Sequence, residues 1–272
     1  RSSLSSEHSA PLAPNAPAEA SLRRVRSSLG AAFTRSGAVL VAYVMAGYPD
    51  RAGSLAALEA VARGGAGVIE LGVPYGDAVA DGPVIVEAGK AALANGFGLA
   101  ETIALAGEFL GARSDAPPVA LMTYLNPMMR LGFPRVAALA AEAGVSGFIV
   151  PDLPPDSPMA NGWLAASEPL GIDTVFLAAP TSTPARLDAL GARSRGFVYV
   201  VSSLGVTGER DELAAGLAGL VARVREHTTL PVAVGFGVGT PEQAAEVAKI
   251  ADGVVVGSAI VRRQGDVGEL AA

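Results

Sequence analysis

The chain contains no cysteine, and only two of its 272 residues are histidines. The lack of cysteine excludes disulfide bonds, thiolate nucleophiles and cysteine-based zinc sites together. It is compatible with a reducing compartment, and we expect a cytoplasmic protein. His8 lies in the first twenty residues and His227 precedes an apolar run, which places it far from the end of any strand. We therefore predict no metal site.

Long apolar runs and clusters of positive charge are also missing. The longest uncharged stretches, Ser36–Pro49 and Thr228–Pro241, are 14 residues long and contain Gly and Pro. A membrane-spanning helix needs about 20 mostly apolar residues, so we interpret both stretches as buried strands. The net charge is −6, and no group of Lys and Arg suggests a nucleic-acid surface. We predict that the chain binds neither membranes nor nucleic acids.

Half of the residues are apolar, which is enough to bury one large core. Residues 1–20 are rich in Ser, Ala and Pro and lack the apolar centre of a secretory signal, so we expect a flexible N-terminal tail there. A barrel of alternating strands and helices forms a single domain of about 250 residues. Residues 21–272 fit one such domain.

Eight short apolar runs recur along the chain, each followed by a helix-length segment. Their residues are apolar in succession, as in strands buried on both faces of a parallel sheet. Eight strands alternating with helices predict a (β/α)₈ barrel, also called a TIM barrel. A doubly wound open sheet is the competing fold, but no Gly-x-Gly-x-x-Gly motif follows the first run. The runs are Val39–Val44, Gly67–Leu71, Val119–Tyr124, Gly147–Val150, Asp173–Leu177, Phe197–Val201, Pro231–Gly235 and Gly253–Val256.

Helix start and stop signals separate these runs. Thr183-Pro184 and Thr240-Pro241 each pair an N-cap hydroxyl with Pro at the first helical position. Gly82–Gly111 is long enough for two helices, and Asn95-Gly96 predicts the break between them.

Two carboxylates follow the second run. Glu70 lies within an otherwise apolar strand, where a carboxylate is either paired with a cation or functional. Asp81 lies eleven residues later, directly before Gly82-Pro83, where the simplest interpretation is a helix N-cap. In a barrel of this type, chemistry occurs where strands end, so both residues stand where a site is expected.

Taken together, the two carboxylates belong to a longer pattern. Residues 70–83 read E-L-G-V-P-Y-G-D-A-V-A-D-G-P. This segment resembles the signature of the tryptophan synthase α-subunit family, which is close to E-L-G-[IV]-P-[FY]-S-D-P-x-A-D-G-P. The resemblance implies cleavage of indole-3-glycerol phosphate, with Glu70 as general acid/base and Asp81 binding the indole N–H. The chemistry fits, because a retro-aldol cleavage needs a proton shuttle and a charge to stabilise a cationic ring nitrogen.

Glycine-bearing turns follow the last three strands, as in the usual phosphate site of such barrels. No Lys or Arg lies in these turns, so backbone amides would have to bind the anion. The resemblance, which extends over roughly residues 25–262, implies the phosphate-binding residues Gly208, Gly235, Phe236, Gly237, Gly257 and Ser258.

The same resemblance implies further residues near the substrate. Tyr199 is expected beside the glycerol chain, although a core aromatic is the alternative. Tyr43, Tyr124 and Asn126 are expected at or behind the indole pocket. Asp152 is expected there too, although it could equally accept a hydrogen bond from a loop backbone.

The loops after the second and sixth strands depart from the family pattern. Residues 75–78 read Y-G-D-A where Ser-Asp-Pro is usual, Met45 replaces a common Thr, and many members have an Arg near Ser203. In the family these loops form a lid and meet a β subunit, so we expect Asp77 and Thr207 to lie at the lid and the partner surface. The resemblance implies an α₂β₂ assembly, with pyridoxal phosphate on the β subunit and no cofactor on this chain.

Three alternatives remain open at this stage. A free-standing indole-3-glycerol-phosphate lyase would have the same fold without an obligate partner, and only the altered loops favour it. A sugar-phosphate isomerase or metal-dependent epimerase would need metal ligands that the histidine count does not supply. A barrel without activity, kept as an allosteric partner, is disfavoured because Glu70, Asp81 and Tyr199 are all present.

Overall fold

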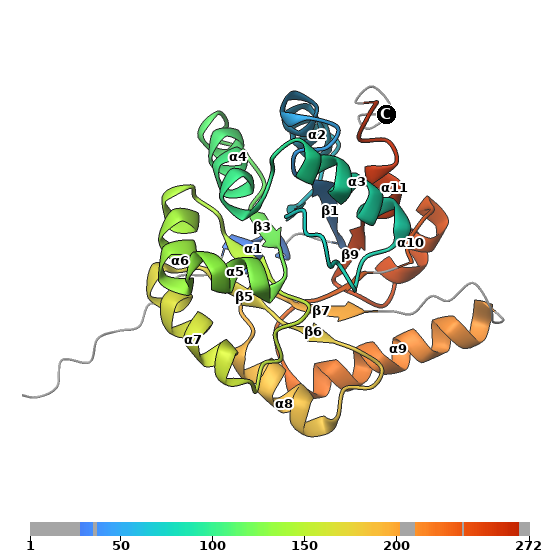
Figure 1. Ribbon diagram of the computed structural model, residues 1–272. Coiled ribbons are helices and arrows are strands. Elements are labelled where there is room, and N and C mark those ends of the chain that lie inside the picture. Colours follow the sequence, from blue (N-terminus) through green and yellow to red (C-terminus); the bar gives the residue numbers. More distant parts are fainter. Residues whose placement is uncertain (1–27, 35–36, 202–209, 236, 267–272) are drawn as a thin grey trace, which may run out of the picture.

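Nine parallel strand segments form a single sheet in the part of the chain that the computed structural model describes (Figure 1). The described residues are 28–34, 37–201, 210–235 and 237–266. The predicted tail, residues 1–20, lies outside them. The segments are β1 Val39–Met45, β2 Val68–Gly72, β3 Val119–Met122, β4 Gly147–Ile149, β5 Asp173–Val175, β6 Leu177–Ala178, β7 Val198–Val201, β8 Val232–Gly235 and β9 Gly253–Val256.

The sheet closes because β5 and β6 are two halves of one strand. The strand order is β5-β4-β3-β2-β1-β9-β8-β7-β6, so the two halves stand at opposite ends of it. Only Phe176 separates them; β5 pairs with β4, and β6 pairs with β7. The Phe176 carbonyl accepts a hydrogen bond of 3.2 Å from the Tyr199 N–H, which continues the pairing across the junction. The predicted eight-stranded barrel is confirmed.

Helices surround the barrel (Figure 1). The predicted break at Asn95-Gly96 is confirmed, and Gly96 adopts a φ of +81°, which favours glycine. Thr183 and Thr240 cap the helices that follow them, as predicted. The helices are α1 Ser28–Ala32, α2 Arg51–Arg63, α3 Pro83–Ala94, α4 Leu99–Gly111, α5 Leu125–Leu131, α6 Phe133–Glu142, α7 Pro158–Ser167, the 3₁₀ turn η1 Glu168–Leu170, α8 Pro184–Arg193, α9 Arg210–His227, α10 Pro241–Ala248 and α11 Ser258–Val261.

The strands are buried along almost their whole length, because helices cover one face and the barrel interior the other. All five residues of β2 are buried, including Glu70. The register pairs Tyr43 of β1 with Glu70 and Glu70 with Ala120 of β3. Among the described helices, none combines the length and the apolarity needed to cross a bilayer.

Helix α1 packs across the amino-terminal end of the barrel. Leu29 is fully buried, and a Cβ added to Gly147 or Gly196 would lie within 2.8 Å of its side chain. The ring of Phe33 approaches Gly253 in the same way. These glycines stand at or just before the start of three strands, where a larger side chain would displace α1. The lack of a side chain at Gly147 and Gly196 thus leaves room for Leu29 of α1, and at Gly253 it leaves room for Phe33, the residue after the helix.

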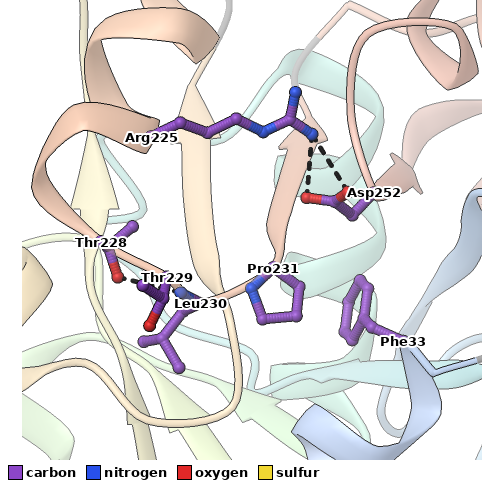
Figure 2. A pocket seen from close by; sticks show the side chains of 7 residues that line it. All are labelled: Phe33, Arg225, Thr228, Thr229, Leu230, Pro231 and Asp252. Carbon is purple, nitrogen blue, oxygen red and sulfur yellow. Dashed lines mark hydrogen bonds and ion pairs between the residues drawn. The ribbon is translucent and has the colours of Figure 1, made fainter.

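A cavity of about 410 Å³ lies beside Phe33 at this same end (Figure 2). Arg225 forms an ion pair of 3.0 Å with Asp252 across it. The other oxygen of Asp252 also accepts a hydrogen bond from the Val232 N–H, which fixes the start of β8. The charged groups of this cavity therefore have structural contacts: Arg225 and Asp252 pair with each other, and Asp252 fixes the start of β8.

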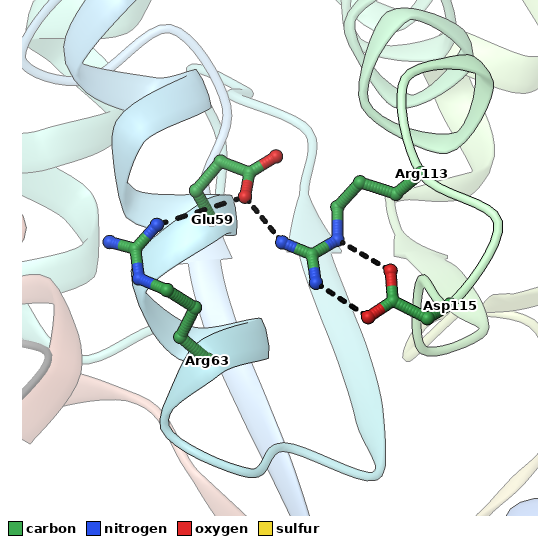
Figure 3. Close-up of polar contacts among 4 residues, drawn as sticks. All are labelled: Glu59, Arg63, Arg113 and Asp115. Carbon is green, nitrogen blue, oxygen red and sulfur yellow. Dashed lines mark hydrogen bonds and ion pairs between the residues drawn. The ribbon is translucent and has the colours of Figure 1, made fainter.

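An ion-pair network links α2 to the segment after α4 (Figure 3). Glu59 contacts Arg113 at 2.6 Å and Arg63 at 3.8 Å. Arg113 also contacts Asp115 at 2.9 Å. The network joins neighbouring helices on the outside of the barrel, far from the strand ends where chemistry is expected.

Candidate active site

A cleft of about 270 Å³ opens at the carboxyl ends of the strands. The three residues expected to be catalytic, Glu70, Asp81 and Tyr199, all line it, although they are far apart in the sequence. The cleft is lined by Tyr43, Glu70, Asp81, Gly82, Ile85, Met122, Tyr199, Gly237, Val238, Gly239, Val255, Gly257, Ser258 and Arg262.

Glu70 projects from β2 into this cleft and is only 2% exposed. Its Oε2 atom has no hydrogen-bond partner among the residues that the structure describes. Burial, and then the charge of Asp81, raise the pKa of Glu70 to about 8. Glu70 is therefore not paired with a cation among the described residues, and it lies inside β2. Near neutral pH, Glu70 carries a proton that it can donate.

Asp81 lies in the loop before α3, and Gly82 rather than Asp81 is the N-cap of that helix. The simplest interpretation from the sequence is thus wrong, because the Asp81 carboxylate is hydrogen-bonded to Tyr124 instead. Burial raises the pKa of Asp81 to about 6, and the Tyr124 hydrogen bond opposes that rise. At pH 7 Asp81 is mostly ionised while Glu70 is mostly protonated.

Two buried tyrosines complete the floor of the cleft. Burial and the nearby carboxylates raise the pKa values of Tyr43 and Tyr199 well above their usual range, so both hydroxyls stay protonated. A Cβ on Gly72 would lie 2.0 Å from the Tyr43 hydroxyl, and one on Gly235 would lie 2.1 Å from that of Tyr199. At Gly235, which is also expected to bind phosphate, the lack of a side chain thus leaves room for Tyr199.

Tyr124, Asn126 and Asp152 are brought together beside the cleft and do not line it. The Tyr124 hydroxyl accepts a 3.0 Å hydrogen bond from the Ala80 N–H, next to Asp81. Asn126 donates to the Tyr75 hydroxyl at 3.0 Å, so α5 lies against the loop that carries Asp81. Asp152 accepts a hydrogen bond of 2.8 Å from the Leu125 N–H, the backbone contact considered as its alternative.

Part of the expected phosphate site lies in the cleft. Gly237, Gly257 and Ser258 line it, and a Cβ on Gly82 would lie 3.9 Å from the Ser258 hydroxyl oxygen. The remaining positions, Gly208 and Phe236, and the lid residue Thr207 lie outside the described residues. Asp77, the other lid residue, is exposed in the loop between β2 and α3.

Sequence reasoning missed Arg262, which also lines the cleft. It follows α11 by one residue and stands outside every motif used above, so only its proximity to Ser258 could have suggested it. Within the described residues, no three His, Cys, Asp or Glu side chains gather into a possible metal cluster.

Comparisons with known proteins agree with this geometry. The family model described as tryptophan synthase alpha chain matches residues 30–270. The tryptophan synthase alpha chain of Leifsonia xyli subsp. xyli is 47% identical over 240 residues, covering 88% of this chain and 90% of that one. That of Methanosarcina mazei is 47% identical over 224 residues, covering 82% and 80%. A structure of tryptophan synthase from M. tuberculosis, in an open form with BRD0059 bound, superposes with a TM-score of 0.79 at 41% identity, covering 91% of this chain and 98% of that one.

The chain belongs to the tryptophan synthase alpha-chain family. The resemblance seen in the loop after the second strand is thereby confirmed over most of the chain. The reaction of a tryptophan synthase alpha chain is the cleavage of indole-3-glycerol phosphate, and the chain is a carbon–carbon lyase of tryptophan biosynthesis. A β subunit is the partner that this family implies.

Proposed function

We propose that Glu70 and Asp81 divide the cleavage of indole-3-glycerol phosphate between them. The observation that carries the proposal is the full burial of Glu70 and the partial burial of Asp81 in one cleft, which raise their pKa values to about 8 and about 6. A protonated and an ionised carboxyl group at neutral pH are the acid and the counter-charge that a retro-aldol cleavage requires.

Glu70 acts first as an acid. It protonates indole C3, and positive charge develops on the ring nitrogen. The resulting Glu70 carboxylate then takes the proton of the hydroxyl group on the adjacent side-chain carbon. That oxygen forms a carbonyl, the carbon–carbon bond breaks, and its electron pair returns to the ring and neutralises the nitrogen. Glu70 ends protonated, so the cycle needs no other proton source.

Asp81 stabilises the cationic ring. Its carboxylate accepts a hydrogen bond from the indole N–H, which strengthens as the nitrogen becomes positive. Tyr124 orients Asp81 from behind and holds the loop at Ala80. This places Tyr124, with Asn126 and Asp152 around it, in support of the indole pocket.

The other end of the substrate lies across the cleft. We assign the phosphate to the turns that contain Gly237, Gly257 and Ser258, with Gly208, Gly235 and Phe236 completing the set by family resemblance. Tyr43 flanks the indole ring, and Tyr199 lies beside the glycerol chain.

Exposed apolar side chains near the cleft support a docking surface for the β subunit. Val79, in the loop that carries Asp81, is 87% exposed, and Met129 on α5 is 51% exposed. The Asn126–Tyr75 hydrogen bond joins these two elements. We propose that this surface binds the β subunit in an α₂β₂ assembly in the cytoplasm. Pyridoxal phosphate would belong to the partner, and this chain would need no cofactor.

Release of indole from indole-3-glycerol phosphate tests the proposal. Glu70→Gln should abolish release, and Asp81→Asn should reduce it by two or more orders of magnitude, as for loss of a preorganised charge. Glu87→Gln is the matched control, since Glu87 on α3 is exposed and forms an ion pair with Lys90. Wild-type activity in Glu70→Gln would overturn the acid/base assignment. Added β subunit should raise turnover; no rise, with a high rate for the isolated chain, would identify a free-standing lyase.

A further inference from the structure

The charged residues that line the described part of the cleft are Glu70, Asp81 and Arg262. Arg262 is thus its one cation within that part of the chain. The side chain is exposed, and within the described residues its guanidinium makes no hydrogen bond or ion pair. Its neighbour Arg263, by contrast, donates to the Ala259 carbonyl and does not line the cleft.

The substrate creates a need for this cation. A phosphate monoester brings a charge of about −1.5 to −2 near neutral pH into a cleft that already holds the Asp81 carboxylate. Helix α11 has only four residues, so its aligned peptide dipoles are few. Residues 202–208 contain no Lys or Arg, and the nearest cation after them in the sequence is Arg210, two residues beyond Gly208. Backbone amides carry no net charge, so Arg262 is the residue of the described lining that can offset the negative charge of the filled cleft.

A buried side chain holds the segment of Arg262 in place. Gln264 is fully buried. Its Oε1 accepts a hydrogen bond from the Met45 N–H at 3.0 Å, and its Nε2 donates to the carbonyls of Met45 at 2.7 Å and Tyr48 at 2.5 Å. Three hydrogen bonds therefore tie the residue two positions after Arg262 to the end of β1, which also carries Tyr43. The backbone at Arg262 is thus fixed beside the cleft.

We propose that Arg262 binds the substrate's phosphate group and makes the enzyme selective for phosphorylated substrates. The planar guanidinium can donate two parallel hydrogen bonds to phosphate oxygens while the glycine turns supply amide donors. This inference rests on the proposed function, because it takes the phosphate end of the substrate to lie at these turns.

The test compares Arg262→Gln, Arg262→Lys and the matched control Arg263→Gln in the full chain. We expect Arg262→Gln to raise KM for indole-3-glycerol phosphate about tenfold or more, with a much smaller change in kcat, because a charge-assisted hydrogen bond is lost. Arg262→Lys should recover part of the loss, and Arg263→Gln should show none.

Binding without turnover separates this inference from the proposed function. The dissociation constants of inorganic phosphate and of indole are measured by calorimetry for the same variants. Phosphate should bind about tenfold more weakly to Arg262→Gln, while indole binding should not change. Equal effects of Arg262→Gln and Arg263→Gln, or no effect of either, would overturn the role of Arg262. A wild-type chain that binds phosphate through Arg262 but releases no indole would instead contradict the proposed function.

Discussion

Replacing Glu70 by Gln should stabilise the protein at neutral pH, although it removes the proposed acid. Burial and the Asp81 charge raise the pKa of Glu70 from 4.5 to about 8. Between pH 4.5 and pH 7 the unfolded chain loses the Glu70 proton while the folded chain keeps it. The free energy of unfolding therefore falls by about 1.4 kcal/mol per pH unit, or about 3 kcal/mol in total by pH 7.

Glutamine has nearly the same shape and cannot ionise, so this loss is absent in Glu70→Gln. The stabilisation from a group with a raised pKa is fully present below the pKa of that group in the unfolded chain. It is lost as the pH rises towards the pKa of the group in the folded chain. The variant and the wild type should thus differ little at pH 4.5, and the variant should be about 3 kcal/mol more stable at pH 7. For a protein of this size, that corresponds to a rise in Tm of roughly 6–12 °C.

Urea unfolding at the two pH values measures the effect. Trp163 is the only tryptophan in the chain and is fully buried, so its fluorescence reports unfolding. The difference in unfolding free energy between variant and wild type is measured at pH 4.5 and at pH 7, and the two differences are compared. This comparison cancels any effect of the new amide that does not depend on pH. Glu87→Gln, at an exposed site on α3, should change that difference by less than about 0.5 kcal/mol. Parallel pH dependences in wild type and Glu70→Gln would refute the buried, proton-holding glutamate.

Three further predictions concern the cleft and the outer helices. Tyr124→Phe removes the hydrogen bond that lowers the pKa of Asp81. The acid limb of the kcat/KM profile, expected near pH 6 in the wild type, should therefore move to higher pH. An unmoved limb would contradict the contact between Tyr124 and Asp81. Gly235→Ala places a Cβ 2.1 Å from the Tyr199 hydroxyl. The variant should be about 1–3 kcal/mol less stable in urea unfolding and should lose much of its activity. Unchanged kinetics would disprove this prediction. Arg113→Ala breaks the network between α2 and the segment after α4 and should lower the midpoint of urea unfolding slightly without altering indole release; a change in KM would show that the network reaches the site.

Local patterns were sufficient for most of the barrel. Runs such as 119–122 and 253–256 are apolar in succession because both faces of each strand are covered, and that requirement is visible in sequence. The interruption of the fifth strand at Phe176 was not predictable. It depends on pairing with β4 on one side and β7 on the other, which only the closed sheet defines.

The candidate site, too, could be predicted from the sequence only in part. The order and spacing of Glu70 and Asp81 made both of them candidates, but the contact that Asp81 makes instead of capping α3 is with Tyr124, which lies 43 positions later. Arg262 reaches the cleft because the last strand of the barrel returns beside the first, and Gln264 fastens it there. Contacts of this kind arise from closure of the barrel, and no window of the sequence contains them.

The packing of α1 across the amino-terminal end has a consequence for synthesis on the ribosome. Leu29 is among the first described residues to be made, yet it packs against Gly147 and Gly196, which are made more than 100 residues later. During translation α1 therefore lacks its contact with Gly147 until β4 is made, and its contact with Gly196 until the segment before β7 is made. Phe33 waits longer still, because its neighbour Gly253 belongs to β9. Full burial of α1 and Phe33 thus comes late in synthesis, in steps that follow these three segments.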